Sequence, residues 1–375
     1  MTSIKISPVR SRRERRLFLQ FPWRIYRRDP LWVPPLLPER RKVIDPRQGA
    51  FFLRGEAEFF IAWQDGKPTG TICVAEDRVT NAQRGLKDCM FGFFECIEDE
   101  AVAQALFRHA EEWAKQRQLN SLYGPFNLDY EDSYGVLIEG RDRPPTILCG
   151  HTPPYYQTFF ENYGFEPARG SNLAYAIDLV DSPALQRLSH LADWVRRNRT
   201  INVRRADLEH WQDESKRVCN LLNRALAHLP DFIPWQPEAV DAMLKPFKDI
   251  ADPELILFAD VGDETVGWFP GIPNLNEVFI HVNGLRYPWN YISLIRHMRC
   301  QPNCLAIKSV LVLPEYWDRG VSVVLFDEMA KRATSKGYKW IDLSLTSDDN
   351  PYTPELTQKM GGVLYKRYQV YRYDL

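Results

Sequence analysis

A short turn leading into a helix carries the clearest chemical signal in this sequence. Its residues are Trp317, Asp318, Arg319, Gly320, Val321 and Ser322. A helix start leaves several backbone N–H groups without partners, beside the positive end of the helix dipole. Such a start binds phosphate or pyrophosphate readily. Most turns of this kind bind nothing, so other residues must support the assignment.

Asp342 is the second residue whose type suggests chemistry. It interrupts the apolar stretch Trp340–Leu345, which is typical of a buried strand. A buried carboxylate is costly unless a partner or a function requires it, so Asp342 is a candidate proton acceptor. Asp348 and Asp349 stand at the end of the same strand, where capping of the next helix is the simpler interpretation.

The spacing of apolar residues predicts the elements that hold these groups. Ser309–Leu313 is a short apolar run with β-branched residues, which indicates a buried strand that Pro314 ends. Apolar residues then recur at every fourth position, which predicts an amphipathic helix over residues 321–336. Gly337 closes this helix, and the strand that contains the candidate carboxylate follows.

This order of strand, loop, helix and strand, followed by an asparagine and a short helix, resembles the acyl-CoA-binding half of the GNAT N-acyltransferase superfamily. In that family the loop reads Gln or Arg, two residues, Gly, one residue, and then Gly or Ala. Gly320 matches the middle glycine, Asn350 the asparagine and Gly361 the end of the short helix. Trp317 and Ser322 depart from the pattern at the first and last loop positions.

The resemblance implies a site for acyl-CoA as co-substrate. The loop residues 317–322 and Asn350 would bind it, and an amine would attack the thioester carbonyl directly. The oxyanion donor would be a backbone N–H on the preceding strand, at Leu311, Val312 or Leu313.

The resemblance also implies a general acid for the departing thiolate. Many members carry a tyrosine four residues before the helix-ending glycine, but Thr357 stands at that position here. Tyr365 is the substitute that we select, and Tyr352 and Tyr368 are alternatives. A thiolate is a fair leaving group by itself, so the acid is dispensable in principle.

Length and composition exclude several classes of protein. The 375 residues have room for two domains, and 45% hydrophobic with 26% charged residues is a globular composition. A formal net charge of −1 argues against nucleic-acid binding, which needs a basic surface. The sequence has no long apolar run for a membrane span and no secretory signal. Its seven scattered cysteines are typical of reduced thiols, so we expect a cytoplasmic protein.

The first half of the chain repeats the elements of the second half in the same order. The matched pairs are segments 58–70 and 254–267, helices 101–117 and 320–336, and the Pro-Tyr pairs 154–155 and 351–352 that precede Gly164 and Gly361. This agreement predicts an internal duplication. Acidic residues 98–100 open the first helix and would repel a pyrophosphate, so only the second copy is predicted to keep a phosphate loop.

The predicted fold is α/β (α+β), with two GNAT-like domains in tandem. Each holds a mixed, mostly antiparallel sheet flanked by helices. Residues 1–180 form the first domain with a degenerate phosphate loop, residues 181–200 form a connecting helix, and residues 201–375 form the domain with the acyl-CoA site.

Features along the whole chain narrow the resemblance to tandem-GNAT proteins, a group that includes bacterial ceramide synthases. They are residues 29–35 (DPLWVPP), 51–52 (FF), 124–127 (GPFN), 139–140 (EG) and 153–156 (PPYY). This resemblance implies transfer of a fatty acyl group from acyl-CoA to a long-chain amino alcohol, and hence a role in lipid metabolism. Two alternatives remain: a non-catalytic binding or sensing protein on a GNAT scaffold, and a peptidoglycan-type aminoacyl transferase, which the neutral charge disfavours.

Three further segments have competing interpretations. Arg10–Arg28 mixes arginines with aromatic residues, so it is either a helix packed on its own domain or a peripheral contact with anionic lipid. The Pro- and aromatic-rich segment Phe269–Pro302 is either a lid over a cleft or packed irregular structure. His297, Cys300 and Cys304 lack a second pair of ligands nearby, so no metal is predicted.

Overall fold

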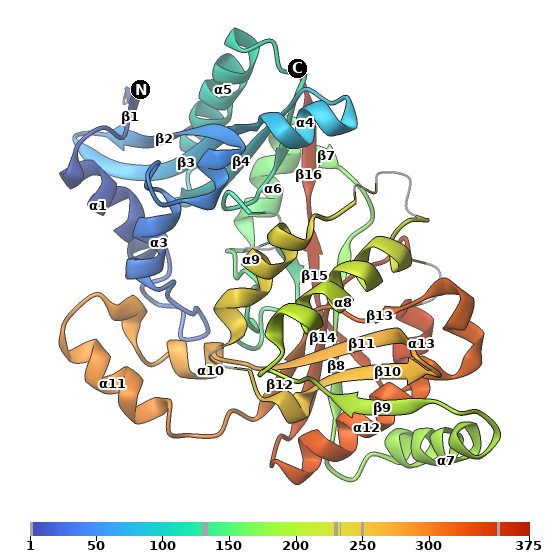
Figure 1. The fold of residues 1–375 in the computed structure, drawn as a ribbon. Coiled ribbons are helices and arrows are strands. Elements are labelled where there is room, and N and C mark those ends of the chain that lie inside the picture. Colours follow the sequence, from blue (N-terminus) through green and yellow to red (C-terminus); the bar gives the residue numbers. More distant parts are fainter. Residues whose placement is uncertain (1–2, 130–133, 229–231, 233, 249–250, 351–352) are drawn as a thin grey trace.

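Two β-sheets with helices against them form the molecule, which is known from a computed structural model (Figure 1). The structure describes residues 3–129, 134–228, 232, 234–248, 251–350 and 353–375. The first half of the chain builds most of the upper sheet in Figure 1, and the second half builds most of the lower sheet.

The first sheet has seven described strands in the order β1-β2-β3-β4-β5-β16-β7. They are β1 (Ile4–Pro8), β2 (Gly55–Gln64), β3 (Lys67–Asp77), β4 (Asp88–Cys96), β5 (Ser121–Gly124), β7 (Glu166–Pro167) and β16 (Tyr371–Asp374). Neighbours are antiparallel except β4 and β5, which are parallel.

The second sheet has nine described strands, in the order β6-β15-β8-β14-β12-β11-β10-β9 with β13 also on β11. They are β6 (Val136–Glu139), β8 (Asn172–Asp178), β9 (Asn202–Arg205), β10 (Ile256–Val261), β11 (Glu264–Pro273), β12 (Cys304–Ile307), β13 (Leu311–Val312), β14 (Trp340–Ser347) and β15 (Val363–Gln369). Here β12 and β14 are the parallel pair. Mixed, mostly antiparallel sheets are therefore confirmed.

The two halves of the chain exchange strands. Strand β8 belongs to the first half but lies between β14 and β15 of the second sheet. Strand β16 ends the chain but lies between β5 and β7 of the first sheet. Figure 1 shows β15 and β16 as one path that runs from the lower sheet into the upper one. Each sheet therefore contains a strand from the other half of the chain. The domain boundary that the sequence predicts near residues 180–200 does not indicate this exchange.

Helices cover both sheets. They are α1 (Arg12–Gln20), α2 (Pro22–Ile25), α3 (Leu37–Val43), α4 (Arg78–Arg84), α5 (Glu100–Gln116), α6 (Tyr155–Tyr163), α7 (Pro183–Asn198), α8 (Trp211–Ala225), α9 (Pro237–Lys248), α10 (Asn276–Phe279), α11 (Trp289–His297), α12 (Val321–Ser335) and α13 (Thr353–Lys359). Short 3₁₀ turns are η1 (Ala50–Leu53), η2 (Pro253–Leu255), η3 (Asn283–Leu285) and η4 (Pro314–Arg319). Helix α7 lies within residues 181–200, the range in which the sequence predicts a connecting helix.

Helices α5 and α12 have equivalent places in the two halves. Each lies in the chain between the two strands of the parallel pair of its sheet, buries one apolar face and leaves charged residues outside. The short helices α6 and α13 both end at a glycine with positive φ, Gly164 at 104° and Gly361 at 90°. A left-handed residue at this position suits glycine, which explains why both copies keep one.

The Arg-rich stretch 10–28 packs inward through its apolar side chains. Phe18, Leu19, Phe21 and Tyr26 are buried, while most of the arginines are exposed. A capping box at Ser11 starts α1. The arrangement is that of an amphipathic helix packed on its own domain.

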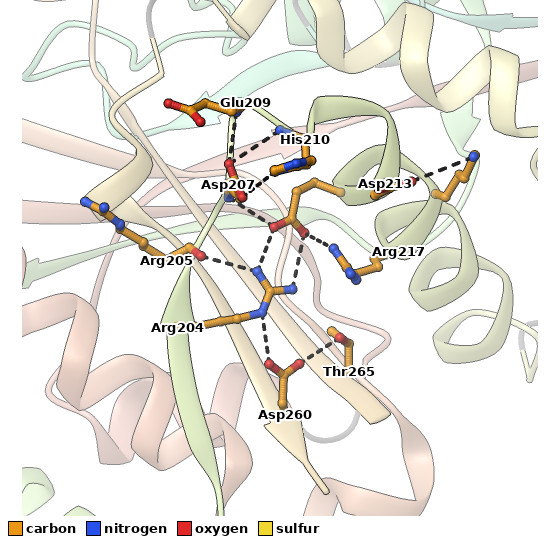
Figure 2. A network of polar contacts seen from close by, with 11 residues as sticks. Arg204, Arg205, Asp207, Glu209, His210, Asp213, Arg217, Asp260 and Thr265 are labelled. Carbon is orange, nitrogen blue, oxygen red and sulfur yellow. Dashed lines mark hydrogen bonds and ion pairs between the residues drawn. The ribbon is translucent and has the colours of Figure 1, made fainter. Parts of the chain in front are cut away.

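A charged network fastens the outer strand β9 to α8 and β10. The Arg204 guanidinium donates to Glu214 at 2.7 and 3.2 Å and to Asp260 at 2.9 Å. Figure 2 shows Arg204 between Asp260 and the start of α8, with Arg217 approaching from that helix. Glu214 also accepts from Arg217, so the charges here are paired with one another. This network is structural.

Candidate active site

The centre of the second sheet opens at the strand predicted to carry the oxyanion donor. Strand β12 pairs with β14 only as far as Ile307 and Leu343. The chain then continues as β13, which pairs with β11 in the described part of the sheet, while β14 continues along β8. One extra residue sits between Ile307 and Leu311 relative to β11, which is a bulge. The strand expected at Ser309–Leu313 is thus β13 alone, and the longer strand lies before it.

Asp342 lies at this strand split and is fully buried. Its Oδ2 accepts hydrogen bonds from Thr146 at 2.9 Å, Ser344 at 2.7 Å and the Lys308 ammonium at 2.8 Å. Its Oδ1 accepts from the Tyr365 hydroxyl at 2.7 Å. The structure therefore brings together Asp342 and Tyr365, the two side chains selected from the sequence. The carboxylate already has a donor on each oxygen, so it is suited to holding its neighbours in place.

Lys308 is the positive charge of this cluster. Burial lowers the pKa of its ammonium, but the adjacent Asp342 carboxylate outweighs burial and raises that pKa above its usual value. Burial, followed by the charge of Asp342, raises the pKa of Tyr365 well above its usual value. Lys308 is therefore charged and Tyr365 protonated near neutral pH. Both contact a carboxylate, and both are partly accessible to solvent.

Sequence reasoning missed four members of the cluster: Lys308, Ser344, Thr146 and Cys149. Lys308 stands alone in an apolar run, and that signal is the same one that revealed Asp342. Thr146 and Cys149 come from the first half, where the Cys149 sulfur lies 3.4 Å from Lys308 Nζ. No local pattern links residues that lie almost 200 positions from Asp342.

The strand β13 supplies a backbone N–H that faces the split. The Leu313 amide donates to Val266 of β11 at 3.0 Å, so it is used inside the sheet. N–H groups alternate in direction along an antiparallel strand, so the Val312 amide points away from β11. The Trp317 indole donates to the Val312 carbonyl at 2.8 Å. Trp317 thus ties the loop to β13, and Val312 is the best placed of the three predicted donors.

The start of α12 has the features expected of an anion site. Gly320 precedes the helix with φ of 78°, no side chain caps the start, and the first turn contains no acidic residue. Arg319 precedes it in the exposed loop, and Arg199 at the end of α7 donates to the Asp318 carbonyl at 3.3 Å. Val321 is buried and Ser322 is half-buried, so of these two side chains the serine is the one that solvent can reach at the start of the helix.

The matching helix of the first half lacks these features. Asp99 caps α5 by accepting from the Ala101 amide at 3.0 Å, and Glu100 occupies the first turn. Its own carboxylates therefore compensate the free N–H groups and repel anions. This contrast agrees with a phosphate loop in the second copy alone.

Asn350 caps the short helix α13, because its Oδ1 accepts from the Thr353 amide at 3.0 Å. The prediction that Asp348 or Asp349 caps this helix is wrong. Asp348 instead accepts from the Ser171 hydroxyl at 2.7 Å, and Asp349 from the Gly170 amide at 2.8 Å. These carboxylates hold the turn before β8, a contact between the two halves that the sequence does not indicate.

The remaining candidate side chains lie as follows. Thr357 is buried, and the Tyr368 hydroxyl is occupied by the Gly150 carbonyl at 3.2 Å. Tyr352 lies outside the described residues. His297 stacks on His281 with ring centroids 4.5 Å apart, and the described residues contain no group of three or more potential metal ligands. None of the described helices is both long and apolar enough to cross a membrane.

A second carboxyl, which is half-buried, lies in the first sheet. Glu95 of β4 accepts from the Tyr156 hydroxyl at 2.7 Å and also hydrogen-bonds Tyr26. Burial raises the pKa of Glu95 from 4.5 to about 8, although both tyrosines act to lower it. A group with such a pKa can exchange a proton near neutral pH. No sequence signal other than an acid inside an apolar strand points to it.

Glu95 should make folding stability depend on pH. Its pKa is higher in the folded than in the unfolded chain, so stability is greatest below the unfolded pKa and falls as pH rises toward about 8. We expect Glu95→Gln, which mimics the protonated acid, to be about 2–4 kcal/mol more stable than the wild type at pH 9 and nearly equal at pH 4.5. Urea unfolding at both pH values measures this difference. The matched change Glu112→Gln, at an exposed position of α5, should leave the free energy of unfolding unchanged at both pH values. Equal unfolding curves for Glu95→Gln and the wild type at pH 9 would contradict the raised pKa of Glu95.

The fold and the site together define a class of protein. It has two GNAT-like sheets, and helix α12 of the second half begins without a side-chain cap or an acidic residue in its first turn. Residues 208–361 match the model of the acetyltransferase (GNAT) family. Over 99% of this chain and 98% of the other, the fold is similar to a tandem GNAT protein from the clavulanic acid biosynthesis pathway, with a TM-score of 0.60 and 11% identity.

The comparisons support an acyltransferase with a GNAT domain in its second half and the fold of a tandem GNAT protein over its whole length. It is 27% identical to the bacterial ceramide synthase of Caulobacter vibrioides, over 98% of this chain and 97% of the relative. It is 25% identical to protein YghO of Escherichia coli, over 94% of this chain and 91% of the relative.

Proposed function

We propose that the chain transfers an acyl group from a CoA thioester to an amine, at the strand split of the second sheet. The observation that carries this proposal is the cluster of Lys308, which follows β12, Asp342 of β14 and Tyr365 of β15, at the point where β12 and β14 part. The open start of α12, with Gly320 and no acid in its first turn, supports a pyrophosphate beside it. Asn350 would act by holding α13 near this site.

The chemistry needs two contributions from the protein, an oxyanion donor and an acid. The amine nitrogen forms a bond to the thioester carbonyl carbon, the C–S bond breaks, the nitrogen releases a proton to solvent and the thiolate gains one. The Val312 amide is proposed to stabilise the oxyanion, with the Lys308 charge nearby. The Tyr365 hydroxyl stays protonated and donates to Asp342, and it is proposed to turn from that carboxylate to supply the proton to sulfur.

Asp342 is proposed to position these groups and not to accept the proton itself. Four donors already occupy its two oxygens, so an incoming ammonium would have to displace one of them. The carboxylate keeps Lys308 charged and orients the Tyr365 hydroxyl. This role differs from the proton acceptor expected from sequence.

The acyl group is proposed to be long and the acceptor to be a lipid amine. Support comes from the whole-length similarity to the relative named bacterial ceramide synthase. A role in lipid metabolism follows from that proposal.

Charge at the start of α12 tests the CoA site. We expect CoA, acetyl-CoA and palmitoyl-CoA to raise the Tm of the wild type, because a ligand that binds only the folded state stabilises it. In Ser322→Glu this shift should disappear, since a carboxylate would repel the pyrophosphate. The same change should leave the unliganded protein equally or slightly more stable, by about 0.3–1 kcal/mol, because it complements the helix dipole.

Ser335→Glu is the matched control, as it makes the same substitution at the exposed far end of the same helix. Ser335→Glu should keep the full rise in Tm with CoA ligands, and it should slightly destabilise the protein without ligand. Detergent-like unfolding by palmitoyl-CoA is controlled with palmitoyl-carnitine. If no CoA species shifts the wild type, or if both variants respond alike, the proposed site is wrong and a binding scaffold without CoA becomes the better interpretation.

A further inference from the structure

Helix α11 has its apolar face outside and its polar face inside. The exposed fractions of its outward residues are 62% for Trp289, 71% for Ile292, 60% for Ile295, and 47% for both Tyr291 and Met298. With 3.6 residues per turn, these positions share one half of the helix circumference. We call these five residues the α11 face. A surface helix normally shows the opposite pattern.

The inward side of α11 explains why the helix nevertheless holds this orientation. Asn290 is buried, and its Oδ1 accepts from the Tyr287 amide at 2.9 Å. The Ser293 hydroxyl donates to the His281 carbonyl at 2.9 Å, and His297 stacks on His281. These specific polar contacts anchor the helix, so the apolar side cannot rotate inward without losing them.

The charged residues of the segment that carries the α11 face are all basic. Residues 278–302 contain Arg286, Arg296 and Arg299 and no acidic residue. Arg296 and Arg299 are exposed beside the apolar residues. A mixture of exposed Trp, Tyr and Ile with arginine is the composition of helices that lie in the boundary of an anionic membrane. A protein partner would need matching acids, whereas an anionic lipid surface satisfies both the apolar and the basic components.

The Arg-rich stretch 10–28 contacts the residues that directly precede α11 in the chain. The Trp23 indole donates to Asn283 Oδ1 at 2.6 Å, and the Arg286 guanidinium lies 5.8 Å from the Trp23 ring centre. Figure 1 shows α1, α3 and α11 along one side of the molecule, with α11 projecting from it. The exposed arginines of α1 therefore add positive charge on the side from which α11 projects.

We propose that the α11 face docks the protein on the surface of an anionic phospholipid bilayer, with the apolar residues at the acyl boundary and the arginines on the lipid phosphates. We therefore place the membrane contact on the α11 face and not on Arg10–Arg28, whose apolar side chains are buried. Docking does not depend on acyl transfer.

Vesicle co-sedimentation of the full chain, without any substrate, tests this proposal. We expect binding to phosphatidylcholine vesicles that contain phosphatidylglycerol and little binding to pure phosphatidylcholine. Ile292→Ser with Ile295→Ser should weaken binding by about 30-fold, because the apolar insertion is lost. Arg296→Gln with Arg299→Gln should weaken it by about 20-fold, with a smaller dependence on salt.

The control pair is Leu53→Ser with Val363→Ser, which removes exposed apolar residues from η1 and β15. It should bind vesicles like the wild type. Equal binding by the α11 variants, or no binding of the wild type to anionic vesicles, would overturn the proposal. Sedimentation velocity covers the remaining case: a wild-type dimer that Ile292→Ser with Ile295→Ser converts to a monomer would identify a second copy as the occupant and would also overturn it.

Discussion

Asp342→Asn is expected to lower kcat/KM for acyl transfer by about 100-fold or more and to destabilise the fold by about 3–5 kcal/mol. Asparagine keeps one accepting oxygen, but its NH2 group donates and therefore cannot replace the second carboxylate oxygen among the donors Thr146, Ser344, Lys308 and Tyr365. It also leaves the Lys308 charge without its counter-ion in a mostly buried position. Release of free CoA measures the rate, and urea unfolding measures the stability.

Two further variants separate positioning from folding. Asp342→Asn with Lys308→Met removes both charges, so stability should return to within about 2 kcal/mol of the wild type while activity stays low. Tyr365→Phe keeps the Lys308–Asp342 pair and should cost no more than about 1.5 kcal/mol, yet it should lower kcat with little change in KM. Full activity in the double variant would show that the cluster serves stability alone.

Gly320→Ala is expected to destabilise the protein by about 2–4 kcal/mol and to abolish stabilisation by CoA. The residue has φ of 78°, which an L-residue adopts only at a cost. A Cβ there would also lie 2.8 Å from Val195 Cγ2 on α7. Relief of that contact would shift the start of α12, whose N–H groups are proposed to bind the pyrophosphate. Thermal unfolding with and without CoA measures both effects.

Gly337 at the other end of α12 is the matched control. Its φ of 90° imposes the same backbone cost, but a Cβ would meet no atom within 4 Å. Gly337→Ala should therefore cost about 1–2 kcal/mol and keep the full CoA shift. Adding Val195→Ala to Gly320→Ala should recover the steric part of the loss. An equal cost at Gly320 and Gly337 would show that the contact with α7 is unimportant.

The proposed membrane surface gives the proposed chemistry a physical context. A lipid amine is held in a bilayer, and an enzyme that acts on it must work at that boundary. The two proposals are nevertheless tested by different measurements, because vesicle binding needs no CoA and the CoA shift needs no vesicle.

The sequence by itself determined several helices and strands, and the chemical character of the candidate site in the second half of the chain. Apolar spacing predicted α12, β14 and α7, the repeated order predicted two sheets, and a carboxylate in an apolar strand identified Asp342. These signals are local, because a helix or strand is encoded by the spacing of apolar residues along one segment.

Only the tertiary structure decided which groups complete the site. The exchange of β8 and β16 between sheets and the bonds from Thr146 to Asp342 and from Ser171 to Asp348 join distant segments. The outward apolar face of α11 is equally invisible in the sequence, where its isoleucines resemble core residues. Which side of a helix faces solvent depends on the polar contacts that anchor it, and those contacts form only when the chain has folded.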